Sequence, residues 1–173
     1  MSDSALLVID LLKDFIEPEG KLSIGDQGPV LAQRLEKLLF EARDKDMTVI
    51  YICDRHLPDD GEFEVFPRHC VQGSEGSEIV ERLSPREGEL VVPKRRYSAF
   101  FGTDLDLILR EKGIDNILLA GVCTNICVLY TAADARNLGY RVKVIPECVA
   151  SFDEEAHKWA LKELEETLGV DIK

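Results

Sequence analysis

Cys127 is the residue of this sequence whose type and position first suggest catalysis. It follows Gly121-Val122-Cys123-Thr124-Asn125, a pattern typical of a tight turn from a strand into a helix. In the first turn of a helix, free backbone N–H groups and the helix dipole favour a thiolate and can hold a tetrahedral oxyanion. Free cysteines are also common packing residues, so Cys123 and Cys127, taken alone, fit a structural role better. Their spacing is not the Cys-x-x-Cys of a typical zinc site.

Two further charged residues directly follow apolar runs. Asp10 comes after Ala5-Leu6-Leu7-Val8-Ile9, and Lys94 comes after Leu90-Val91-Val92-Pro93. A carboxylate in this position is poorly solvated unless another group pairs with it. In isolation, Asp10 fits a loop cap equally well, and Lys94 is more typical of a solvated surface lysine.

A third group contains two of the three histidines. Asp54-Arg55-His56 follows another apolar run, and His69 comes thirteen residues after His56. Asp, His and His suit a divalent metal that keeps open positions for water or substrate. Three such residues on loops are a weak signal for a metal by themselves. We expect His157 to be an exposed residue of a polar helix.

The elements that must position these residues alternate between strand and helix. The expected strands are 5–9, 48–52, 90–92, 117–120, 142–145 and a short one at 170–172. Four helices are expected, and two of them cover residues 30–44 and 125–138. Another begins at the N-cap pair Thr103 and Asp106 and ends near Gly113. The last begins at a Ser151/Glu154 capping box and is terminated by Gly169. Pro93 is expected to stop the third strand.

Strands that are apolar throughout require a sheet with both faces covered by helices, and alternating strands and helices form a parallel sheet. We therefore expect one α/β domain over residues 1–173, a three-layer α/β/α arrangement around a Rossmann-like parallel sheet of about six strands. Active sites of such sheets lie beyond the carboxyl ends of the strands. Asp10, Asp54, Lys94 and Cys127 should all project from that edge.

The composition indicates a soluble globular protein. The 173 residues are 45% hydrophobic and 31% charged, with a net charge of −12 that disfavours nucleic acid and anionic membranes as partners. The five cysteines are an odd number and are scattered, which does not favour a disulfide framework. No secretory signal pattern is found, and we expect a cytoplasmic protein.

Read together, several segments resemble the isochorismatase-like cysteine hydrolase superfamily, and within it the nicotinamidases. The matching segments are Leu7-Val8-Ile9-Asp10 with Asp14-Phe15, Asp54-Arg55-His56, Phe66-Pro67-Arg68-His69-Cys70-Val71, Pro93-Lys94-Arg95-Arg96-Tyr97-Ser98-Ala99-Phe100, Gly102-Thr103-Asp104-Leu105 and Ala120-Gly121-Val122-Cys123-Thr124-Asn125-Ile126-Cys127-Val128. They occur in order over nearly the whole chain. Asp-x-His with the later His indicates the metal-dependent nicotinamidase branch.

The resemblance implies a role for each catalytic position. Cys127 matches the nucleophile, Asp10 the general acid/base and Lys94 the cation beside both. It also implies a cis peptide between Val122 and Cys123, with an oxyanion hole formed by the backbone N–H groups of Cys123 and Cys127. The implied reaction is hydrolysis of nicotinamide to nicotinate and ammonia, a step in NAD salvage.

The resemblance also implies the ligands. Asp54, His56 and His69 match the metal ligands, with zinc the usual metal. The aromatic residues that match those beside the substrate ring are Phe15, Phe66 and Tyr97. The expected partners are a small carboxamide and further copies of the chain in a homo-oligomer.

Some positions depart from the family pattern and leave alternatives open. Arg55 and Phe66 stand where many members carry Trp, and the loop between His56 and His69 is short. These differences affect substrate contacts and leave the reaction type unchanged. The alternatives are another cysteine amidohydrolase, such as an N-carbamoylsarcosine amidase, and a non-catalytic ligand-binding relative. N-carbamoyl-specific relatives generally lack the metal site.

Overall fold

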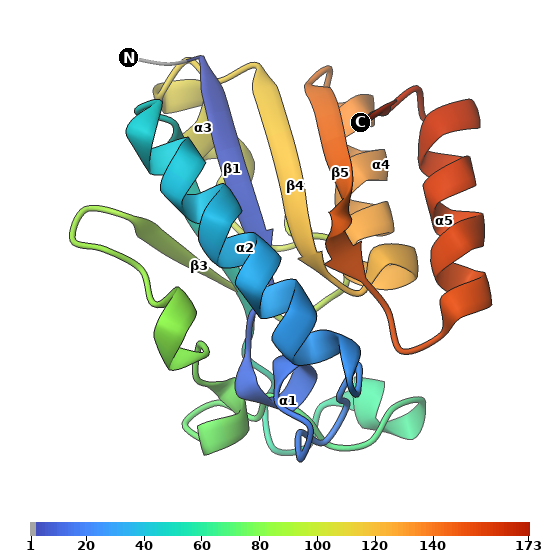
Figure 1. Cartoon of the computed structure of the whole chain (residues 1–173). Coiled ribbons are helices and arrows are strands. Elements are labelled where there is room, and N and C mark those ends of the chain that lie inside the picture. The colour runs from blue at the N-terminus through green and yellow to red at the C-terminus, as the bar shows by residue number, and fades with distance from the viewer. Residues whose placement is uncertain (1–2) are drawn as a thin grey trace.

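The computed structural model describes residues 3–173, and its centre is a six-stranded sheet in the order β3-β2-β1-β4-β5-β6. Figure 1 shows β1, β3, β4 and β5 of this sheet. All neighbouring strands are parallel. The strands are β1 (Ser4–Ile9), β2 (Thr48–Asp54), β3 (Leu90–Lys94), β4 (Asn116–Val122), β5 (Arg141–Ala150) and β6 (Asp171–Ile172). The chain builds outward from β1 in one direction through β2 and β3, and in the other through β4, β5 and β6. The strand order therefore reverses between β1 and β4, which is where open α/β sheets bind ligands.

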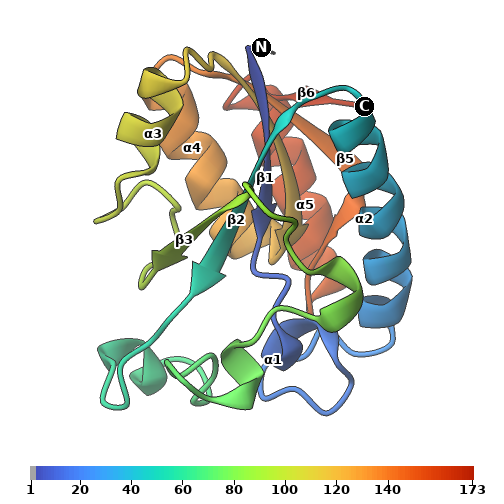
Figure 2. The ribbon, with the colours of Figure 1, turned by 90° about the vertical axis from the view of Figure 1, so that its left-hand side faces the viewer.

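Helices cover both faces of this sheet, as expected (Figure 2). The helices are α1 (Lys13–Ile16), α2 (Gln27–Asp44), α3 (Leu105–Glu111), α4 (Leu129–Asn137) and α5 (Glu154–Glu166), with short turns η1 (Gly61–Glu64), η2 (Glu75–Ser77), η3 (Glu81–Leu83) and the π-helical η4 (Thr124–Val128). Alternate side chains of a strand point to opposite faces. Leu6 and Val8 of β1 accordingly pack with α1 and α2, whereas Leu7 and Ile9 pack with α3, α4 and α5. The three-layer α/β/α fold is confirmed.

Two elements differ from their expected bounds in ways that affect the site. β3 does not stop at Pro93 and continues to Lys94, pairing with Cys53 and Asp54 of β2. β3 is an edge strand, where the missing N–H of a proline is tolerated. The expected helix over 125–138 is divided into η4 and α4. π-helical turns of this kind occur frequently at functional sites.

The expected helix caps were partly wrong. The N-cap of α5 is Asp153, which accepts a hydrogen bond from Ala156 N–H, while the Ser151 hydroxyl donates to the Asn125 side chain of η4. Ser151 therefore contacts the turn that carries Cys127. At α3, the Thr103 hydroxyl accepts from the backbone N–H of Leu105. None of the helices within residues 3–173 is long and apolar enough to cross a membrane.

Candidate active site

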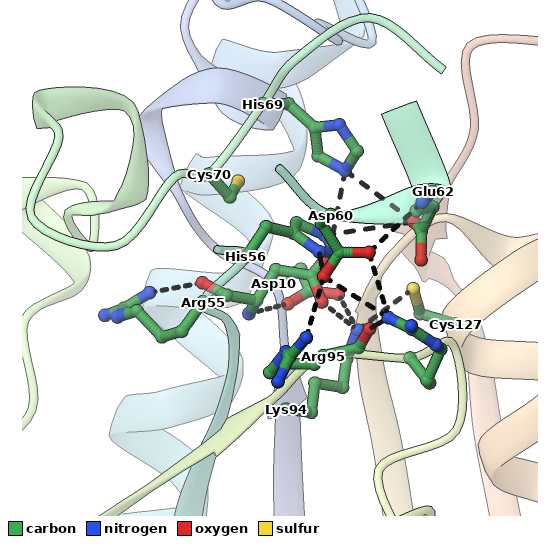
Figure 3. A network of polar contacts seen from close by, with 12 residues as sticks. Asp10, Arg55, His56, Asp60, Glu62, His69, Cys70, Lys94, Arg95 and Cys127 are labelled. Atoms are coloured by element: carbon green, nitrogen blue, oxygen red, sulfur yellow. Dashed lines mark hydrogen bonds and ion pairs between the residues drawn. The ribbon is translucent and has the colours of Figure 1, made fainter. Parts of the chain in front are cut away.

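Asp10, Lys94 and Cys127 meet at the carboxyl edge of the sheet, each from a different strand end. Lys94 Nζ lies 2.9 Å from Asp10 Oδ2 and 3.3 Å from Cys127 Sγ (Figure 3). The same Nζ lies 2.6 Å from Oδ1 of Asp54, the last residue of β2. Lys94 is 2% exposed and Asp10 is fully buried. A buried ammonium thus joins two carboxylates and a thiol.

The backbone around Asp10 and Gly121 allows this close arrangement. Asp10 has a φ of 53°, in the left-handed region that is sparsely populated outside glycine and that often marks functional sites. Its carboxylate accepts a hydrogen bond of 2.8 Å from the backbone N–H of Asp54. Gly121 has a φ of 118°, and a Cβ there would lie 2.0 Å from the carbonyl oxygen of Ile9. Only glycine lets β4 approach β1 this closely before the chain turns into η4.

Burial controls the protonation of the catalytic candidates. Burial, together with repulsion from Asp54, raises the pKa of Asp10 to about 6 although Lys94 acts in the opposite direction. Burial also raises the pKa of the Cys127 thiol well above its ordinary value, against the effect of Lys94. Burial lowers the pKa of Lys94, but Asp10 and Asp54 outweigh it and raise that pKa well above its ordinary value. The resting state is therefore a neutral thiol beside an ammonium and a carboxylate whose pKa suits proton transfer near neutral pH.

The turn after β4 has the expected peptide geometry. The bond between Val122 and Cys123 is cis, and Cys123 is the N-cap of η4. Cys127 lies inside this five-residue turn and is 5% exposed. The oxyanion-hole role of the Cys123 and Cys127 N–H groups remains a prediction.

Asp54, His56 and His69 also converge, and they form a second cluster that shares Asp54 with the first. Asp54 Oδ2 lies 3.5 Å from His56 Nε2 and 3.9 Å from His69 Nε2. One candidate ligand atom from each of these residues lies within 4.8 Å of those of the other two. His56 Nε2 is buried and has no hydrogen-bond partner among the described residues. A buried, unpartnered nitrogen of this kind requires an explanation, and a bound divalent cation provides one.

Glu62 of η1 belongs to the same cluster and was missed from the sequence. Its Oε1 lies 3.8 Å from His56 Nε2 and 3.9 Å from His69 Nε2. Burial, followed by repulsion from Asp54, raises the pKa of Glu62. Two imidazoles and two carboxylates form a donor set that zinc accepts. The only signal in the sequence was the position of this acidic residue between His56 and His69.

An aromatic pocket opens onto both clusters. Phe15 and Phe66 face His69, with ring centroids 5.4 Å and 6.4 Å from that of the imidazole, and Tyr97 lies 6.4 Å from Phe66. The structure thus brings together the three aromatic residues expected beside a substrate ring. The complete lining of the pocket is Phe15, Leu22, Asp54, Glu62, Phe66, His69, Tyr97, Cys123, Ile126, Cys127 and Phe152.

Phe152, two residues after the end of β5, is a pocket residue that the sequence did not reveal. Its ring centroid lies 6.4 Å from that of Phe66, and its side chain is 42% exposed, so it borders the pocket on the solvent side. The enclosed volume is about 10 Å³, close to what one water molecule needs. A ring-shaped substrate therefore requires side chains at the mouth to move.

His157 does not lie fully exposed on the surface, contrary to expectation. It is half-buried, and its Nδ1 lies 2.8 Å from the hydroxyl of Thr124, the first residue of η4. Burial lowers the pKa of His157. The correction follows from the packing of α5 against η4, which the sequence pattern of α5 alone did not indicate.

Comparison with known proteins agrees with this geometry. The isochorismatase domain family matches residues 4–172. The chain belongs to the isochorismatase family. A nicotinamidase from Bacillus subtilis is 37% identical, with a TM-score of 0.93 and 99% of each chain covered. A pyrazinamidase from Pyrococcus horikoshii, solved in complex with zinc, is 30% identical with a TM-score of 0.93 over 99% of each chain.

The same fold is shared by a relative that is named for a different activity. An N-carbamoylsarcosine amidase from Thermoplasma acidophilum is 34% identical, with a TM-score of 0.89 over 98% of this chain and 95% of that one. The family and the amidohydrolase class are therefore confirmed. Overall similarity does not select the substrate, and that choice depends on the pocket.

Proposed function

We propose that this amidohydrolase hydrolyses nicotinamide to nicotinate and ammonia through a thioester on Cys127, a reaction of NAD salvage. The observation that carries the proposal is that the two carboxylate oxygens of Asp54 face different clusters. Its Oδ1 contacts Lys94 of the catalytic cluster, and its Oδ2 faces His56 and His69. This contact supports a catalytic cluster and a binding site for the pyridine nitrogen that lie next to each other, which suits an aromatic carboxamide.

In the proposed mechanism, Asp10 accepts the thiol proton of Cys127, and the sulfur forms a bond to the carboxamide carbon. The ammonium of Lys94 stabilises the negative charge that moves between Asp10 and the sulfur. The carbonyl oxygen becomes an oxyanion, which the backbone N–H groups of Cys123 and Cys127 hold. Asp10 then donates its proton to the nitrogen as the C–N bond breaks, and ammonia leaves.

The second half-reaction uses the same residues. Asp10 takes a proton from a water molecule, whose oxygen attacks the thioester carbon. The C–S bond breaks, the acid product leaves, and the proton held by Asp10 returns to the sulfur of Cys127. Each cycle consumes one water and releases one ammonia, with no change in oxidation state.

The metal cluster has a separate role in this proposal. Asp54, His56 and His69, together with Glu62, would hold a zinc ion, which supplies a Lewis-acidic binding point for the pyridine nitrogen. Phe15, Phe66 and Tyr97, which line the pocket, would pack against the substrate ring. This binding orients the carboxamide toward Cys127, and correct orientation is itself a large part of catalysis.

The test is ammonia release from nicotinamide, pyrazinamide and N-carbamoylsarcosine, combined with metal analysis of the purified protein. Cys127→Ala should abolish turnover, whereas Cys148→Ala, which changes another buried cysteine, should not. His69→Ala should lose the metal and raise the KM for nicotinamide strongly. Release from N-carbamoylsarcosine alone, by a protein without stoichiometric metal, would show that the nicotinamide assignment is wrong.

A further inference from the structure

Both histidines of the metal cluster have their Nδ1 atoms held by an acceptor. His69 Nδ1 lies 2.7 Å from the carbonyl oxygen of Pro67, and His56 Nδ1 lies 3.2 Å from Oδ2 of Asp60. A carbonyl oxygen and an ionised carboxylate can only accept, so the proton of each neutral ring must be on Nδ1. The lone pair of each ring is then on Nε2, the atom that faces Asp54 and Glu62.

Asp60 has more contacts than orienting His56 alone requires. Its side chain has no exposed area, and its Oδ1 accepts a hydrogen bond of 3.1 Å from the backbone N–H of Glu62. This bond makes Asp60 the N-cap of η1, the turn that presents the Glu62 carboxylate to the cluster. The buried Asp60 carboxylate therefore contacts two candidate metal ligands. It meets the imidazole ring of His56 and the backbone N–H of Glu62.

Two arginines contact the Asp60 carboxylate. Arg96 Nη1 lies 3.1 Å from Asp60 Oδ1. Arg95 Nη2 lies 3.5 Å from Asp60 Oδ2 (Figure 3). Both arginines follow Lys94 directly at the end of β3. The contacts join the loop after β2 to the segment after β3, so Asp60 is held from a second part of the chain.

We propose that Asp60 is a positioning residue for the metal cluster, which fixes the ring of His56 with Nε2 free and holds η1 so that Glu62 faces it. This inference rests on the metal site of the proposed function. Partners of this kind fix the tautomer and orientation of a ligating imidazole, and removing one typically weakens metal binding by about 10–100-fold. Asp60 is not itself a lining residue of the pocket and is not expected to contact substrate.

The test is zinc affinity, measured by competition with a chromophoric chelator, for the full chain and for Asp60→Asn. Asp59→Asn is the matched control, because Asp59 is the exposed neighbour and loses the same charge. We expect Asp60→Asn to bind zinc about 10–100-fold more weakly and Asp59→Asn to bind it as the parent does. The visible absorption spectrum of the cobalt-loaded Asp60→Asn protein should also change, because the ligands are displaced.

A second variant separates positioning from simple anchoring of the loop. Asp60→Glu keeps the negative charge that faces Arg95 and Arg96, but its longer side chain cannot meet His56 Nδ1 and Glu62 N–H with the same geometry. We expect a folded protein with an intermediate loss of zinc affinity. Zinc binding as tight as that of the parent in either folded variant overturns the role of Asp60. A parent chain that binds no zinc overturns the metal site as well.

Discussion

Replacing Asp10 by Asn should lower turnover strongly and leave the zinc-free protein as stable as the parent or more stable. The rise in the pKa of Asp10 from 3.8 to about 6 corresponds to a cost of about 3 kcal/mol for holding the ionised carboxylate in the folded state. Asn removes the charge and can still accept the hydrogen bond from Asp54 N–H. Its amide group faces Lys94, so the net gain should lie between 0 and about 3 kcal/mol.

The pH dependence gives this prediction a definite sign. Because the folded-state pKa is raised, the unfolded chain releases the Asp10 proton first, and the parent loses stability as pH rises from 3.8 to about 6. The stability advantage of Asp10→Asn should therefore be full above about pH 6 and disappear toward 3.8. Turnover should fall by at least about 10²–10⁴-fold because the proton acceptor is gone.

The assay is urea unfolding of both proteins across this pH range in the presence of a chelator, together with ammonia release. Lys94→Met is the contrasting variant, because it leaves two buried carboxylates without their cation and should cost about 3–5 kcal/mol. A clear loss of stability in Asp10→Asn at neutral pH would refute the reasoning. So would a stability difference between Asp10→Asn and the parent that does not change with pH.

Three other changes have separate readouts. Phe152→Ala should widen the pocket mouth, raise the KM for nicotinamide and improve turnover of ring-substituted analogues; unchanged selectivity would contradict this. Thr124→Val should cost about 1 kcal/mol in urea unfolding because the contact with His157 is lost. Although burial raises the pKa of Glu89, the hydrogen bonds from Arg43 hold it below its ordinary value. Glu89→Gln should therefore lower the free energy of unfolding by about 1–2 kcal/mol at neutral pH. This difference from the parent should disappear as pH falls through the pKa of Glu89.

The meeting of Asp10, Lys94 and Cys127 was predictable because it depends on strand direction. Each residue lies at or just beyond the end of a different apolar segment, and the carboxyl ends of parallel strands share one edge. The same rule placed Asp54 there. Their separations were not predictable, since they depend on the close approach of β4 to β1 at Gly121 and on the continuation of β3 through Pro93.

Residues whose role depends on loop conformation were not accessible from the sequence. Glu62 and Asp60 lie on a loop without hydrophobic periodicity, and only folding brings them to His56 and His69. Phe152 reaches the pocket from the end of β5, on the other side of β1. A one-dimensional pattern contains no signal for such contacts between distant segments.

The alternation of strands and helices, the parallel sheet, and the sheet edge that carries Cys127, Asp10 and Lys94 were predictable from the sequence. These features follow from local hydrophobic patterns and from the chirality of crossover connections. Only the folded structure shows that Asp54 contacts both clusters, that Glu62 lies beside His56 and His69, and that burial raises the pKa of the Cys127 thiol. Those properties depend on burial and on distances between loops, which exist only in the folded chain.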